Sequence, residues 1–187
     1  GQNAMIVDSS ALLEQVVMDV IQSAFGSAGQ RCSALRVLYI QEDIYPRLIK
    51  LLQGAMAELK IGDPRLLSTD IGPVIDREAL EKLQAHVLRM RDSHDIIYQC
   101  ELSQDCSGGY FMPAVAIHID SIQELSEEVF GPVLHVIQYA REDLDKVIDD
   151  INNTGFGLTL GVQSRITTTA EKIRTRVRAG NCYVNRT

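Results

Sequence analysis

The sequence lacks the features that mark several non-enzymatic classes of protein. Cations are few, since 18 Lys and Arg stand against 25 Asp and Glu and leave a net charge of −7. A nucleic-acid surface needs concentrated Lys and Arg to displace counterions, and we find no basic patch. Long apolar runs are also missing, because the longest, such as residues 114–119, have the length of a strand. We therefore expect no nucleic-acid partner, no membrane span and no apolar leader.

Metal-ligand and disulfide patterns are equally scarce. The four cysteines include no C-x-x-C pair, and their spacings from the four histidines match no common zinc pattern. Each histidine stands alone near apolar neighbours, so we interpret none as a ligand or a base. We therefore expect no metal, reduced thiols and a cytoplasmic location. The chain shows no repeat, linker or shift in composition, so residues 1–187 are expected to form one domain.

Helical and strand-like periods alternate along the chain. This alternation predicts an α/β fold with three αβα layers around a mostly parallel sheet. The predicted helices run from a cap at Ser9 or Ser10 to about Gly26 and over residues 45–59, 76–90, 143–152 and 167–177. The predicted strands cover residues 35–40, 96–99, 114–119, 131–139, 158–163 and 182–184.

The loop from Phe25 to Ala34 presents one cysteine beside a cation and a hydroxyl. Glycine lets such a loop bend, and a thiolate is stabilised by a neighbouring positive charge or by backbone N–H groups. Cys32 is therefore the candidate nucleophile. The alternative is a small buried residue at a helix end, which is the commoner role of a free cysteine.

The same loop resembles the cysteine loop of the aldehyde dehydrogenase superfamily, and residues 127–134 resemble the second signature of that family. Five further family landmarks occur in the expected order, three between the two signatures at residues 61–64, 69–73 and 109–113, and two after them at residues 153–159 and 180–185. Residues 29–36, together with 1–4 and 184–186, are most similar to the dehydrogenase module of the bifunctional proline utilization A enzymes. Those enzymes oxidise proline and then glutamate semialdehyde, the open form of 1-pyrroline-5-carboxylate.

The resemblance implies a role for several residues. Cys32 would attack the aldehyde carbon, NAD or NADP would accept the hydride, and water would hydrolyse the resulting thioester. Glu128 matches the carboxylate that accepts hydrogen bonds from the nicotinamide ribose, and Phe130 matches the aromatic side chain beside it. Ser33 would donate a hydrogen bond to a substrate carboxylate, and the positive charge of Arg31 would add a favourable electrostatic field.

Each of these assignments has an ordinary structural alternative. Glu128 ends an acidic stretch, residues 124–128, that would usually be solvated, and Phe130 would usually be core. The Ser33 hydroxyl would bond its own turn, and Arg31 would be a surface cation. Gly155 and Gly157 are better interpreted as a turn between a helix and a strand than as a phosphate loop.

The resemblance also implies that parts of the catalytic machinery lie outside this chain. The family's general base, second oxyanion donor and nucleotide-binding domain are expected upstream, and its substrate-anchoring loop and subunit-pairing tail downstream. The fragment alone is then expected to be inactive, the parent to be a homo-oligomer, and FAD to be present only with an upstream proline dehydrogenase domain. Three alternatives stay open: another aldehyde dehydrogenase, such as one for succinate semialdehyde; a thiol hydrolase, which needs a histidine against Cys32; and a non-catalytic fold module.

Overall fold

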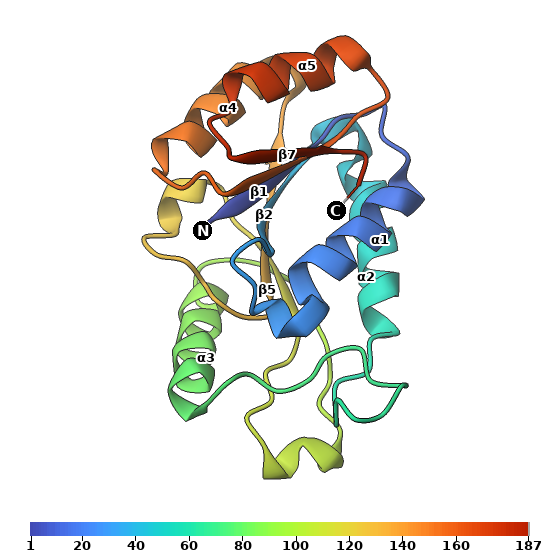
Figure 1. Cartoon of the computed structure of the whole chain (residues 1–187), viewed down its shortest axis with the longest axis vertical. Helices are drawn as coiled ribbons and strands as arrows, with labels where there is room; N and C mark the ends of the chain where they lie inside the picture. Colours follow the sequence, from blue (N-terminus) through green and yellow to red (C-terminus); the bar gives the residue numbers. More distant parts are fainter. Residues whose placement is uncertain (187) are drawn as a thin grey trace.

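The computed structural model describes residues 1–186, which fold around one seven-stranded sheet (Figure 1). The strands lie in the order β3-β4-β5-β2-β1-β6-β7. All neighbouring strands are parallel except the edge pair β3 and β4, which is antiparallel. Their bounds are β1 Asn3–Val7, β2 Leu35–Gln41, β3 Ile96–Gln99, β4 Val115–His118, β5 Val133–Tyr139, β6 Thr159–Gln163 and β7 Asn181–Val184.

Helices cover both faces of this sheet. In Figure 1, α1 (Leu13–Phe25) and α2 (Tyr45–Ala57) lie on its right, while α3 (Arg77–Arg91) and α4 (Leu144–Asn153) lie on its left. The fifth helix, α5 (Thr167–Arg176), is joined to α4 by ion pairs from Asp145 to Lys172 and Arg176. The α/β prediction with a mostly parallel sheet is therefore confirmed. In residues 1–186, no helix has both the length and the apolarity to cross a membrane.

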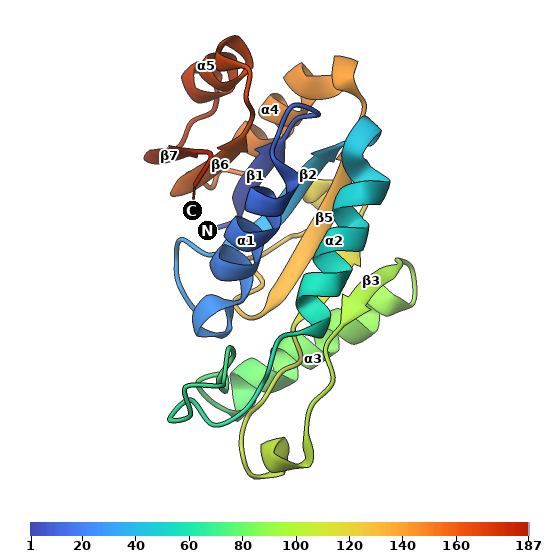
Figure 2. The same cartoon turned by 90° about the vertical axis from the view of Figure 1, so that its right-hand side faces the viewer.

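The central strands are buried on both faces, which explains their nearly continuous apolar sequences. All seven residues of β2 are buried, and so are all five of β1. The sequence analysis missed β1, because a run of five such residues beside a stronger helical pattern carries no period of its own. Packing decides its structure, since β1 pairs with β2 on one side and with β6 on the other (Figure 2).

The start of the first helix differs from the prediction, because the polar side chain expected to cap it has other partners. The predicted cap at Ser9 or Ser10 is wrong, because α1 begins at Leu13 and has no side-chain cap. Instead, the Ser10 hydroxyl donates to Asp8 at 2.5 Å and accepts from the backbone N–H of Arg165 at 2.8 Å. By contrast, Asp76 does cap α3, accepting the Ala79 N–H at 2.8 Å.

The predicted site residues gather at the amino ends of the parallel strands. The loop that carries Cys32 leads into β2, and the loop that carries Glu128 leads into β5. Because β2 and β5 are neighbours, these two loops lie side by side at one edge of the sheet. Asn3 starts β1 and Thr159 starts β6 at the same edge.

Candidate active site

Cys32 lies at the tip of a tight turn. The N–H of Ala34 donates to the carbonyl of Arg31 at 3.0 Å, which closes a β-turn with exposed Cys32 and Ser33 at its centre. Asn3 fixes this turn to the sheet, because its side-chain amide donates to the carbonyls of Cys32 at 2.8 Å and Ala34 at 2.9 Å. The thiol is thus exposed on a backbone that is anchored on both sides.

A left-handed segment delivers the chain to this turn. Ser27, Ala28 and Gly29 have φ values of 57°, 54° and 65°. A non-glycine residue in that region costs on the order of 1 kcal/mol or more, so neighbouring contacts must hold the segment in place. One such contact is the approach of Gly29 to Gly131, whose carbonyl oxygen would lie 2.1 Å from a Cβ at position 29. The expectation that glycine lets this loop bend is confirmed at Gly29.

Gln30 connects the same segment to the loop before α3. The backbone N–H of Ile75 donates to the Gln30 side chain at 2.8 Å, and the Gln30 amide donates to the carbonyl of Pro73 at 3.2 Å. The loop that carries Cys32 is therefore held by three other parts of the chain.

Arg36 joins the two signature loops, and the sequence analysis did not single it out. Its side chain is 1% exposed and donates to the carbonyls of Gly131 at 3.1 Å and Arg31 at 3.2 Å. It also donates to Glu128 Oε1 from Nε at 3.3 Å and from Nη2 at 3.2 Å, and its guanidinium lies 5.0 Å from the centre of the Phe130 ring. Burial lowers the pKa of Arg36, and Glu128 opposes that shift.

Glu128 and Phe130 are neither fully solvated nor part of the core. The Glu128 side chain is 22% exposed, and its second oxygen contacts the amino nitrogen of Gly1. Phe130 is 45% exposed. Both ordinary alternatives for these residues therefore fail, because the carboxylate has a buried cationic partner and the ring stands at the surface.

Two hollows flank the cysteine turn. One, of about 560 Å³, lies between α3 and residues 127–130 and is lined by Gln30, Glu128 and Phe130; we call it the α3 groove. The other, of about 250 Å³, is lined by Arg31, Ser33, Thr159 and Arg186; we call it the Ser33 hollow. Gln30, two residues before Cys32, thus faces the α3 groove, whereas Arg31 and Ser33 face the Ser33 hollow.

Arg31 and Ser33 both line the Ser33 hollow, but Arg31 also has a structural contact. Its guanidinium donates to the carbonyl of Gln22 near the end of α1 at 2.9 Å. Basic side chains are favourable at that position, because the last carbonyls of a helix lack partners within it. The Ser33 carbonyl accepts from the Thr159 hydroxyl at 3.5 Å.

The histidines do not stand alone, so that prediction is wrong. His86 and His135 are buried and their Nε2 atoms are 2.8 Å apart. His86 Nδ1 contacts Arg89 at 2.9 Å, and His135 Nδ1 contacts the carbonyl of Arg36 at 3.2 Å. Burial lowers the pKa of His86 to about 4 and that of His135 to about 3.

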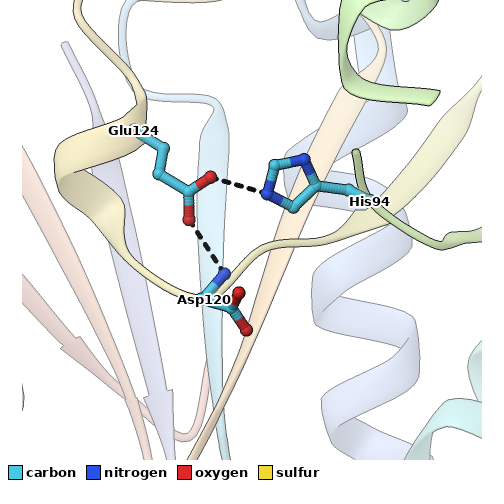
Figure 3. A group of neighbouring side chains, drawn as sticks. All are labelled: His94, Asp120 and Glu124. Carbon is cyan, nitrogen blue, oxygen red and sulfur yellow. Dashed lines mark hydrogen bonds and ion pairs between the residues drawn. The ribbon is translucent and has the colours of Figure 1, made fainter. Parts of the chain in front are cut away.

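A second histidine cluster lies at the opposite end of the strands (Figure 3). His94 Nε2 is 2.6 Å from Glu124, and possible ligand atoms of His94, Asp120 and Glu124 all lie within 4.8 Å of one another. Glu124 also accepts the backbone N–H groups of Asp120 at 3.0 Å and Ser121 at 2.8 Å, in a capping box. The carboxylate therefore has protein partners on both oxygens, and the absence of a metal stays a prediction.

These contacts weigh against the thiol hydrolase alternative. Within residues 1–186, the hydrogen-bond and ion-pair partners of the four histidine side chains do not include Cys32. The other three cysteines are also free, and two of them are buried. Cys100 and Cys106 donate to the carbonyls of Met56 and Ile61.

Comparison with known proteins shows the family of this chain. The family model described as "Aldehyde dehydrogenase family" matches residues 1–187. The chain is 53% identical to the Bifunctional protein PutA of Klebsiella aerogenes, of which it covers 15%, and 34% identical to the 1-pyrroline-5-carboxylate dehydrogenase of Geobacillus sp. (strain WCH70), of which it covers 36%. All of this chain is aligned in both cases.

Solved structures give the same result. A crystal structure of bifunctional proline utilization A superposes over the whole chain with a TM-score of 0.95 at 49% identity, and the match covers 18% of that protein. A putative aldehyde dehydrogenase from Burkholderia cenocepacia gives a TM-score of 0.91 at 25% identity, with 39% of it covered. The chain therefore spans less than half of each of these relatives. With a family match over its full length, the chain belongs to the aldehyde dehydrogenase family.

Proposed function

We propose that this chain is part of an NAD-dependent dehydrogenase that oxidises glutamate semialdehyde, the open form of 1-pyrroline-5-carboxylate, with Cys32 as its nucleophile. The observation that carries the proposal is the exposure of Cys32 at the tip of a loop in which Gln30 lines the α3 groove and Arg31 and Ser33 line the Ser33 hollow. Such an arrangement suits an oxidation by hydride transfer, because the aldehyde carbon must lie within reach of both the Cys32 thiolate and the hydride acceptor.

In the proposed reaction, the Cys32 thiolate adds to the aldehyde carbon and forms a C–S bond, which gives a thiohemiacetal. The backbone N–H of Cys32 is the donor that this chain offers to the developing oxyanion. Loss of hydride leaves a thioester on Cys32. Water then cleaves the C–S bond with the help of a general base, which releases the carboxylate and restores the thiolate. The base and the second oxyanion donor are expected in parts of the protein upstream of residue 1.

The α3 groove has side chains that fit the nicotinamide end of NAD or NADP. Glu128 offers acceptor oxygens for vicinal ribose hydroxyls, and Arg36 holds that carboxylate through two hydrogen bonds to Oε1. Phe130 offers an exposed aromatic surface in the same groove. When bound, NAD or NADP supplies the hydride acceptor. The choice between the two stays open, because the residues that would read the adenosine ribose are expected outside this chain.

The charge of the Ser33 hollow supports an anionic aldehyde. Two cationic residues, Arg31 and Arg186, line it, and its described lining residues include no Asp or Glu. A substrate carboxylate there would meet favourable charges and the Ser33 hydroxyl. The names of the relatives, Bifunctional protein PutA and 1-pyrroline-5-carboxylate dehydrogenase, favour glutamate semialdehyde. Succinate semialdehyde is the second candidate, because it carries a carboxylate as well.

The test is NADH formation by the full-length protein from 1-pyrroline-5-carboxylate and from succinate semialdehyde, with Cys32→Ala as the control. We expect a higher kcat/KM for the first substrate and no turnover by the variant. Preference for succinate semialdehyde would replace the substrate and keep the mechanism. Turnover by Cys32→Ala would overturn Cys32 as the nucleophile, and no turnover by the wild type on either aldehyde would leave only the fold.

The wider setting of the chain stays a prediction. The partners we propose are the nucleotide-binding domain of the same protein and further copies of it in a homo-oligomer, and the location is the cytoplasm. FAD would belong to a proline dehydrogenase domain elsewhere in the parent. Residues 1–187 expressed alone should form no NADH, and activity of that piece would show that it contains a base of its own.

A further inference from the structure

A line of hydrogen-bonded side chains leads from the α3 groove to the residue that joins the two signature loops. It begins at Arg89 and His86 on α3, both of which line the groove. It crosses to His135 on β5 and ends at the backbone carbonyl of Arg36 on β2. Each step is 2.8 to 3.2 Å long. Arg89, His86 and His135 have no role in the proposed chemistry, whereas Arg36 holds the proposed cofactor carboxylate of Glu128.

The two ends of this line fix the position of every proton in it. Arg89 only donates, so His86 Nδ1 must accept and the His86 proton lies on Nε2. That proton points at His135 Nε2, which must therefore accept, so the His135 proton lies on Nδ1. From Nδ1 it is donated to the Arg36 carbonyl, which can only accept. Both rings are neutral in this arrangement, in agreement with their lowered pKa values.

We propose that His86 and His135 are positioning residues that fix Arg36 and, through its side chain, Glu128 and the cysteine turn. The guanidinium of Arg36 contacts the carbonyl of Arg31, next to Cys32, and the carboxylate of Glu128. Any shift of the Arg36 backbone therefore reaches both the nucleophile and the proposed cofactor contact. His135, on the neighbouring strand, holds that backbone through its hydrogen bond to the Arg36 carbonyl.

The effect on cofactor binding rests on the proposed function. Loss of the bond from His135 to Arg36 should weaken NAD binding, because Glu128 loses its fixed partner. One neutral hydrogen bond corresponds to a change of about three- to tenfold in an equilibrium. We expect the KM for NAD to rise by about that factor, while the KM for the aldehyde changes less than twofold.

Matched substitutions distinguish positioning from simple packing. His135→Asn keeps an N–H donor near the position of Nδ1, whereas His135→Leu fills the space without one. In the same way, His86→Gln keeps a donor near Nε2, and His86→Leu does not. In the full-length protein we expect both Leu variants to raise the KM for NAD and both amide variants to return it to within about twofold of the wild type.

A second measurement does not need enzymatic activity. The rate at which iodoacetamide alkylates Cys32 in the full-length protein should change about threefold or more in His135→Leu and His86→Leu, and little in the amide variants. Equal KM values and equal alkylation rates in the Leu and amide variants would overturn the positioning role. If the His135 variants fail to fold, the comparison of His86→Leu with His86→Gln tests the positioning role. An inactive wild type with altered alkylation in the Leu variants would sink the proposed function and keep the positioning role.

Discussion

Stability should fall steeply as the pH is lowered from about 7 towards 4, because the two buried histidines bind no proton in the folded state. An unfolded histidine has a pKa of about 6.5. The folded pKa is about 4 for His86, where burial is the main cause and Arg89 adds to it. It is about 3 for His135, where burial acts with the charges of His86, Arg36 and His94, against the hydrogen bond to the Arg36 carbonyl.

The sign follows from where each state binds protons. Below pH 6.5 the unfolded chain takes up a proton on each histidine, while the folded chain takes up none until the pH approaches 4. One pKa unit corresponds to about 1.4 kcal/mol, and pH 5 lies about 1.5 units below the unfolded pKa. Each histidine should therefore lower the free energy of unfolding by about 2 kcal/mol at pH 5 relative to pH 7.5, and the pair should lower it by about 4 kcal/mol. That is a large part of the stability of an ordinary domain.

The assay is urea unfolding followed by far-UV circular dichroism at pH 7.5, 6.0 and 5.0. The control is the double variant His86→Gln with His135→Asn, which removes both titrations and keeps the other two histidines. We expect the wild type to lose about 4 kcal/mol more than the double variant between pH 7.5 and 5.0. Equal losses in the two proteins would refute the neutral, buried state of the pair.

Three further predictions follow from the turn and its surroundings. Iodoacetamide at pH 8 should label Cys32 at least about tenfold faster than Cys100, because the buried Cys100 thiol has a pKa raised to about 11. Peptide mass spectrometry measures both labelling rates, and equal rates would contradict an accessible nucleophile. Ser33→Ala should raise the KM for 1-pyrroline-5-carboxylate about tenfold or more, since a hydrogen bond to a charged group is lost, and Ser33→Thr should restore the wild-type KM. Steady-state kinetics measure this, and wild-type KM values in both variants would refute the contact between the Ser33 hydroxyl and the substrate carboxylate. Gly29→Ala should destabilise the chain by about 3 kcal/mol or more, because its Cβ would overlap the carbonyl of the loop before β5. Gly54 is exposed on α2, and no atom lies within 4 Å of a Cβ at that position. Gly54→Ala should therefore stabilise the chain by up to about 1 kcal/mol. Thermal denaturation compares the two variants, and equal melting temperatures would contradict this difference.

Local pattern was enough to predict most of the elements, because periodicity reports burial directly. The strand Ile96–Gln99 was predicted with its observed bounds, and the other predicted elements differ by one or two residues at their ends, except the first helix, which begins two or three residues later than predicted. The antiparallel pairing of β3 could not be predicted, because pairing direction depends on the path of the whole chain. The cap at Ser10 failed for a similar reason, since its hydroxyl is taken by Asp8 and by a residue that follows β6.

The candidate site was predictable only where a motif carries it. Cys32, Glu128 and Phe130 came from the two signatures, and the structure brings those signatures together. Asn3 and His135 were missed, because their roles depend on which strands are neighbours. One signal was present in the sequence: β2 is a strand of buried residues, and Arg36 lies within it. A cation in such a strand requires a buried partner, and that requirement points to an acidic residue elsewhere in the chain.

The partner of Arg36 explains how two loops far apart in sequence can act as one unit. Glu128 is 92 residues away along the chain, and burial of the guanidinium without it would be strongly unfavourable. The remaining donors are directed at the carbonyls of Arg31 and Gly131, one in each signature loop. A displacement of either loop would leave a buried donor without an acceptor. The cysteine turn and the proposed cofactor carboxylate therefore have one favourable relative position, which the fold sets before any ligand is bound.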